Sequence, residues 1–210
     1  MVGEAGLDIL SSSNVTITRV ATINTFGDGM TVFANFGTSN QPTTNLQVNG
    51  LDITQAGRQG VTMAYAKDST LNGVRVNSAS GSAWDFESDL PGIGSGNIIV
   101  NNASGTKGVR FIEALQGPVT FNDCQCERHL TLTHEAAASG QLVTFNRGTL
   151  LLPRTDHGIT PAGVVVAGPG KLRLADVTLW NLPGTRKVSG PNWSITGDGS
   201  LTLVHTTAPR

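Results

Sequence analysis

The sequence predicts an all-β fold built from stacked repeats of short strands. Of its 210 residues, 14% are charged and 5% are aromatic, while glycine alone contributes 26. This composition is typical of many short strands joined by tight turns, and it is unlike that of a disordered chain or a helical enzyme. Two further observations predict the same fold. The sequence repeats a self-similar unit of just over twenty residues, and apolar residues alternate within that unit.

The repeat is clearest in three stretches, residues 50–56, 73–79 and 96–103. Each has a glycine, then two apolar residues two positions apart, then a small residue three positions further on. Apolar residues two apart face the same side of a strand, so each stretch predicts a strand with one buried face. The opening glycines recur at intervals of 21 to 30 residues, at Gly50, Gly73, Gly96, Gly117, Gly140, Gly170 and Gly199.

Each unit carries two sets of apolar pairs and a column of small residues. The first set is Leu51/Ile53, Val74/Val76, Ile98/Val100, Val119/Phe121, Val143/Phe145, Leu172/Leu174 and Leu201/Leu203. The second set is Val61/Met63, Trp84/Phe86, Val109/Phe111, Leu130/Leu132, Val164/Val166 and Trp193/Ile195. The small residues, expected to stack at one tight inner corner, are Ala56, Ala79, Ala103, Cys124 and Gly148.

Together with a third short element before each glycine, this pattern is typical of a right-handed parallel β-helix. We predict a single-stranded β-helix of about seven or eight coils over residues 43–210. Residues 1–42 are predicted to form an N-terminal cap and a first irregular coil, because the rhythm is lost between Phe26 and Pro42. A β-sandwich is the alternative, but sandwiches do not repeat in register.

Over about residues 43–206 this repeat rhythm resembles that of the pectin-lyase-like superfamily of parallel β-helices. That superfamily includes polysaccharide lyases, glycoside hydrolases and the stems of bacteriophage tailspikes. The resemblance rests on the rhythm and is not accompanied by a diagnostic catalytic motif. It implies that acidic residues on the outer face of one sheet would carry any sugar-cleaving activity.

Asp85 and Glu87 are the candidate acid pair of such an enzyme. If Trp84 and Phe86 point inward, both carboxylates point outward from one strand, about 6 to 7 Å apart at the backbone. Arg110 is then expected beside Asp85 in the next coil, in an ion pair or as a cation for an acidic sugar. The equivalent outward positions of other coils carry no further acid: Thr62, Thr131, Val165 and Ser194. We therefore expect no catalytic residues and keep an enzyme that uses Asp85, Glu87 and Arg110 as the alternative.

Apolar residues at outward positions predict contact with other chains. Ile99, Ile112, Leu151 and Val165 each stand where a strand should face water, which favours self-association, with a homotrimer as the expected assembly. Cover by longer loops is the alternative. Loops that project in the C-terminal third supply further expected contacts: Arg154, Asp156, His157, Arg186 and Lys187.

Charge and residue spacing limit the partners. The net charge of −1 gives no electrostatic case for nucleic acid, and no apolar run approaches the roughly 18 to 20 residues that cross a membrane. The N-terminus lacks a signal-peptide pattern, which predicts synthesis in a cytoplasm. We expect no metal and no cofactor. Cys124 and Cys126 are expected to be buried structural thiols, since two ligands make a weak metal site.

Three functional hypotheses follow. The first is a non-enzymatic structural protein of a virus particle, from a bacteriophage, forming a decoration, spike or fibre that contacts capsid or tail proteins and host-surface glycans. The second is a tailspike-type polysaccharide depolymerase, either a hydrolase or a lyase. The third is a carbohydrate-binding adhesin module. Since fold alone does not fix function, the site has to decide between them.

Overall fold

The computed structural model describes residues 4–34, 41–87, 93–112, 115–133, 140–152, 163–167, 170–181, 193–196 and 199–207. Within these ranges the chain forms strands in two sheets, and none of the described residues is helical. Every pairing between these strands is parallel. The prediction of an all-β chain with parallel sheets is therefore confirmed.

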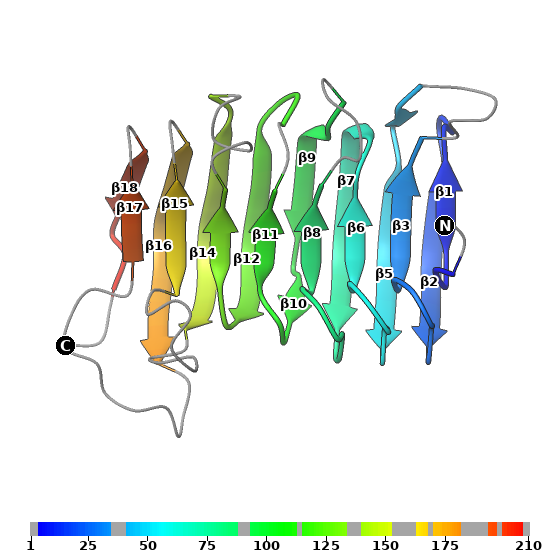
Figure 1. Cartoon of the computed structure of the whole chain (residues 1–210), viewed down its shortest axis with the longest axis horizontal. Helices are drawn as coiled ribbons and strands as arrows, with labels where there is room; N and C mark the ends of the chain where they lie inside the picture. The colour runs from blue at the N-terminus through cyan, green and yellow to red at the C-terminus, as the bar shows by residue number, and fades with distance from the viewer. Residues whose placement is uncertain are drawn as a thin grey trace.

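The chain visits the two sheets alternately, so both sheets extend in step from the N-terminal to the C-terminal end (Figure 1). The eight-stranded sheet contains β1 (Asp8–Leu10), β3 (Met30–Phe33), β6 (Val61–Met63), β8 (Trp84–Phe86), β11 (Val109–Phe111), β13 (Leu130–Leu132), β15 (Val164–Ala167) and β17 (Trp193–Thr196). The ten-stranded sheet contains β2 (Thr16–Ile23), β4 (Thr43–Thr44), β5 (Gln47–Thr54), β7 (Ala66–Val76), β9 (Gly96–Asn101), β10 (Ser104–Gly105), β12 (Val119–Glu127), β14 (Leu142–Leu152), β16 (Lys171–Asn181) and β18 (Ser200–Val204).

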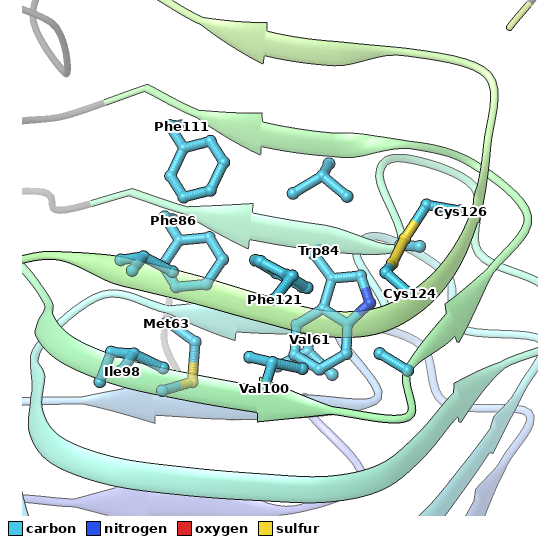
Figure 2. Close-up of a cluster of buried hydrophobic side chains, with 14 of the residues drawn as sticks. Val61, Met63, Trp84, Phe86, Ile98, Val100, Phe111, Phe121, Cys124 and Cys126 are labelled. Carbon is cyan, nitrogen blue, oxygen red and sulfur yellow. A yellow bond between two sulfur atoms is a disulfide. The ribbon is translucent and has the colours of Figure 1, made fainter. Parts of the chain in front are cut away.

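The core lies between the inner faces of the two sheets (Figure 2). Trp84 of β8 meets Phe121 of β12 edge to face, with ring centroids 5.4 Å apart. Along the stack, Phe86 lies parallel to Phe111, and Phe121 lies parallel to Phe145, each pair at 4.7 Å. Each of these buried rings contributes about 1.5 to 3 kcal/mol by leaving water, so the aromatic stack is a main source of stability.

The register of the eight-stranded sheet confirms the second set of apolar pairs. Trp84 lies between Val61 and Val109 on the neighbouring strands. The same register continues through Leu130/Leu132, Val164/Val166 and Trp193/Ile195. Sequence reasoning missed an earlier member of this set: Met30 and Val32 pair with Val61 and Met63 inside the segment where the rhythm was lost.

The predicted cap contributes strands to the ends of both sheets. Strand β1 pairs with β3, and β2 pairs with β5. Gly29, which precedes β3, is in close contact with the next pass of the chain: a Cβ there would lie 2.7 Å from the carbonyl oxygen of Gly60. Glycine lets the two passes approach there, and Gly60 does the same before β6, where a Cβ would lie 2.5 Å from the carbonyl oxygen of Ala83.

The first set of pairs was aligned wrongly at its third member. Val100 shares its register with Leu71, and Leu71 shares its own with Val48, so Val100 does not continue the column of Ile53 and Val76. The error came from the glycines. Gly50 and Gly73 have left-handed φ values of 86° and 64° at a bend within their strands, whereas Gly96 begins β9. Other residues take the left-handed position in the neighbouring passes: Arg19, Asn102, Asp123, Arg147, Asp176 and His205.

The predicted column of small residues likewise divides into two. Ala56 and Ala79 form a bridge at one corner. Cys124 and Gly148 pair at the bend, where the amide of Gln125 also donates to the carbonyl oxygen of Ala103. Cys124 and Cys126 are joined by a disulfide, which corrects the prediction of two free thiols (Figure 2). Both cysteines are buried, as expected.

An asparagine ladder runs across the ten-stranded sheet just before the bend. The amide nitrogen of each member donates to the side-chain oxygen of the previous one, over 2.8 to 3.0 Å, through Asn49, Asn72, Asn101, Asn122 and Asn146. Arg173 ends the ladder by donating to Asn146 over 3.1 Å. Such a ladder fixes the register because a one-residue slip would break every bond in it.

Candidate functional site

The residues that stand in register with Asp85 form one row, called the outer row, across the eight-stranded sheet. In register from one end, the outer row consists of Asp8, Thr31, Thr62, Asp85, Arg110, Thr131, Val165 and Ser194. The expected neighbours of Asp85 are confirmed, including Arg110 on the next strand. Asp8 and Thr31 extend the row beyond the positions recognised in the sequence.

Asp85 lies in this row but not in water. Its side chain is 0% exposed, and neither carboxylate oxygen has a hydrogen-bond partner. The closest cation is Arg110, whose Nη1 lies 3.7 Å from Oδ2 of Asp85. Burial, followed by the negative charge of Glu87, raises the pKa of Asp85 to about 7, although Arg110 acts in the opposite direction. A carboxyl group that is half protonated near neutral pH is therefore held beneath the surface.

Asp28 is a second buried acid, and the sequence did not single it out. It precedes β3, and its carboxylate accepts hydrogen bonds from Thr62 Oγ1 at 2.7 Å, from the backbone amide of Gln59 at 3.0 Å and from Thr31 Oγ1 at 3.3 Å. These bonds connect two strands of the outer row. The flanking glycines, Gly27 and Gly29, are the available signal, but they fall in the segment that the sequence predicts to be an irregular coil.

Glu87 completes the carboxylate cluster, the name used here for Asp28, Asp85 and Glu87. Arg58 lies between two of its members, with Nε 3.9 Å from Asp28 Oδ1 and Nη2 3.8 Å from Glu87 Oε1. The three acids are thus accompanied by two arginines, Arg58 and Arg110. Among the described residues no group of three potential ligands is placed to hold a metal ion.

The carboxylate cluster has the electrostatic form of an acid–base pair, because the surroundings of Asp85 favour its protonated form while Glu87 is partly exposed and ion-paired. Access is the difficulty. A proton donor must come within about 3 Å of the atom it protonates. The carboxyl of Asp85 is covered, so a polymer cannot reach it in the present arrangement.

The residues predicted for self-association are not brought together. Ile99 lies on β9 and Leu151 on β14 of the ten-stranded sheet, whereas Val165 lies on β15 and Ile112 follows β11 of the other sheet. Polar residues flank Ile99 and Val165 in register: Thr70 and Thr120 beside Ile99, and Thr131 beside Val165. Leu151 lies between Glu127 and Trp180. Ile99 is 44% exposed, and the other three are half-buried.

The predicted loop contacts Arg154, Asp156, His157, Arg186 and Lys187 lie outside the described residues. No described segment forms a helix that is long and apolar enough to span a membrane. Comparison of the chain with models of protein families, with curated proteins and with solved structures found no match. The functional argument therefore depends on the residues themselves.

Proposed function

We propose that the chain is a right-handed parallel β-helix that serves as a non-enzymatic structural protein of a bacteriophage particle. In this role it forms a self-associating decoration, spike or fibre and contacts capsid or tail proteins. The observation that carries the proposal is the unbroken parallel register of the ten-stranded sheet from β2 to β18. Its asparagine ladder, together with the aromatic stack of the core, makes a rigid body suited to bearing load.

The burial of Asp28 and Asp85 supports the non-enzymatic role. Asp28 uses its carboxylate to connect Thr31 and Thr62, which is a structural task. Asp85 is closed off from solvent. Resemblance of the repeat rhythm to phage tailspike stems supplies the virion assignment, since a fold by itself does not fix function.

Native mass spectrometry tests self-association. We expect an assembly of three chains of 21.9 kDa each. Ile99→Asp should shift the population to monomer, because a charge would be buried at the contact. Ile23→Asp, on the same sheet but on its end strand, is the matched control and should leave the trimer intact. A wild-type monomer would contradict the proposal, and absence of the chain from purified virus particles of its source would contradict the virion assignment.

A polysaccharide depolymerase is the second candidate, favoured by the raised pKa of Asp85 next to Glu87. Its test is the release of reducing ends from a panel of bacterial capsule and cell-wall polysaccharides. If the pair is catalytic, Glu87→Gln should reduce the rate by at least about a hundredfold. Asp52→Asn, an exposed acid paired with Arg75 on the other sheet, should leave it unchanged. Equal rates for wild type and Glu87→Gln would exclude this candidate.

A further inference from the structure

A groove crosses the outer face of the ten-stranded sheet, away from the carboxylate cluster. It has a volume of about 350 Å³ and crosses the strands β7, β10, β12 and β14. Nine residues line it: Val76, Asn77, Ser104, Gly105, Thr106, Gln125, Glu127, Thr149 and Leu151. Strand β10 is only two residues long, and its small side chains leave the hollow between the longer ones on β7 and β12.

The groove offers hydrogen-bonding side chains in two rows. Ser104, Gln125 and Thr149 share one register, and Glu127 is paired with Leu151 in the other. Asn77 donates to Thr54 over 3.2 Å, which leaves its side-chain oxygen to accept. Hydroxyl, amide and carboxylate groups thus face one hollow, so a ligand there would meet both donors and acceptors.

An exposed tryptophan extends the second row. Leu151 pairs with Trp180 of β16, whose side chain is 54% exposed. Adjacent strands are about 4.8 Å apart, so the distance from Asn77, which follows β7, to Trp180 on β16, four strands on, is about 19 Å. An indole ring at the end of a polar groove provides a flat apolar platform beside hydrogen-bonding groups.

The chemistry of the groove excludes several occupants. Glu127 is the only charged residue among the nine that line the groove. Its negative charge disfavours binding of nucleic acid and of acidic polymers. Six of the nine side chains are polar, which disfavours an apolar ligand. An extended peptide would need a free strand edge, but β10 is already paired with β7 and β12. A neutral chain of hydroxyl-bearing rings satisfies all three conditions.

We propose that this groove binds a neutral oligosaccharide, which lies across the strands with one sugar ring on Trp180 and its hydroxyl groups on Gln125 and Glu127. The apolar face of a pyranose ring fits a flat indole. The strand spacing is similar to the length of one sugar unit, so successive units would meet successive strands. The site is separate from the carboxylate cluster and does not depend on the proposed assembly, whose test is a mass measurement.

A glycan array of neutral and acidic microbial glycans, probed with the intact chain, tests the proposal. We expect binding to neutral oligosaccharides, confirmed by calorimetry with a dissociation constant in the millimolar range or tighter. Trp180→Ala should weaken binding by at least about tenfold, and Gln125→Ala by about fivefold. Ile23→Ala, which removes an exposed apolar side chain from the same sheet outside the groove, is the matched control and should bind like wild type.

Three results would overturn the proposal. They are binding to no neutral glycan on the array, preferential binding to acidic glycans, and unchanged affinity in both Trp180→Ala and Gln125→Ala. Thermal melting of each variant shows whether it is folded. If Trp180→Ala fails to fold, Gln125→Ala, whose side chain is exposed, carries the test alone.

Discussion

Single residues determine how this protein responds to pH, and Asp85 is the main one. Its pKa is raised from 3.8 to about 7, chiefly by burial and then by Glu87, and Arg110 and Arg58 oppose the shift while Asp28 adds to it. Below pH 3.8 folded and unfolded chains both hold the proton. Between pH 4 and 7 the unfolded chain releases it and the folded chain does not, so stability falls as pH rises and the loss is complete above 7.

We predict that Asp85→Asn removes this part of the pH dependence. The free energy of unfolding of the variant, relative to that of wild type, should rise by on the order of 4 kcal/mol between pH 4 and pH 8. Urea denaturation at a series of pH values measures it. Asp52→Asn, an exposed acid with an ion pair to Arg75, is the control and should run parallel to wild type. If the free energy of unfolding of Asp85→Asn changes with pH in the same way as that of wild type, ionisation of the Asp85 carboxyl does not destabilise the folded chain.

At the candidate site, the sequence predicts the direction of some side chains but not their burial. The outward direction of Asp85 and its neighbour Arg110 followed from the two-residue period of a strand. Burial of Asp85 did not follow, because the two-residue period gives the direction of a side chain and not what lies over it. Asp28 was missed because its partners Gln59 and Thr62 belong to the next pass of the chain.

At the scale of elements, the asparagine ladder connects five passes of the chain by side chains alone. Asn122 stands inside it and makes two bonds, donating to Asn101 over 2.8 Å and accepting from Asn146 over 3.0 Å. Asn49 stands at its end and accepts a single ladder bond, from Asn72. Substituting Asn122 and Asn49 in turn therefore compares how much an interior and an end position of the ladder contribute to stability.

We predict that Asn122→Ala lowers the free energy of unfolding by about 2 to 3 kcal/mol, because a partly buried neighbour on each side, Asn101 and Asn146, loses one of its hydrogen bonds. Asn49→Ala should cost about 1 kcal/mol or less. Chemical denaturation followed by circular dichroism gives both values. Equal losses in the two variants would mean that the ladder bonds act independently of their position.

The register of the strands could be predicted from the sequence where it depends on inward-facing apolar pairs. Apolar pairs such as Trp84/Phe86 and Val109/Phe111 were placed in register correctly, because inward side chains must match across parallel strands. Glycine was a poor marker of the bend. The left-handed conformation there is filled by Gly50 in one pass and by Asp123 in another, so one backbone position has several sequence signatures.

On the scale of the whole molecule, burial decreases toward the C-terminal end of the stack. Leu174 of β16 is fully buried, whereas Leu203, its partner on the end strand β18, is 42% exposed. An inner-facing residue on an end strand lacks a neighbour on one side and loses much of its apolar burial. Local opening should therefore be easier at this end than in the middle.

Hydrogen exchange measured by mass spectrometry should show this gradient. We expect amides of β12, in the middle of the ten-stranded sheet, to exchange at least about a hundredfold more slowly than those of β18. If the trimer forms through side-by-side contacts, the gradient should persist in the assembly. Uniform exchange across both strands would mean that the stack opens as one unit.

The left-handed bend has a consequence for how such a chain can grow or shrink. In the C-terminal half the bend positions carry Asp123, Arg147, Asp176 and His205, and the carboxylate of Asp123 accepts hydrogen bonds from Arg147 over 2.9 and 3.0 Å. Asp176 pairs with His205 at 3.3 Å. Loss of the single pass that holds Arg147 would place Asp123 against Asp176, like against like. Loss of the Arg147 and Asp176 passes together would instead place Asp123 against His205, the same kind of pair that Asp176 and His205 form.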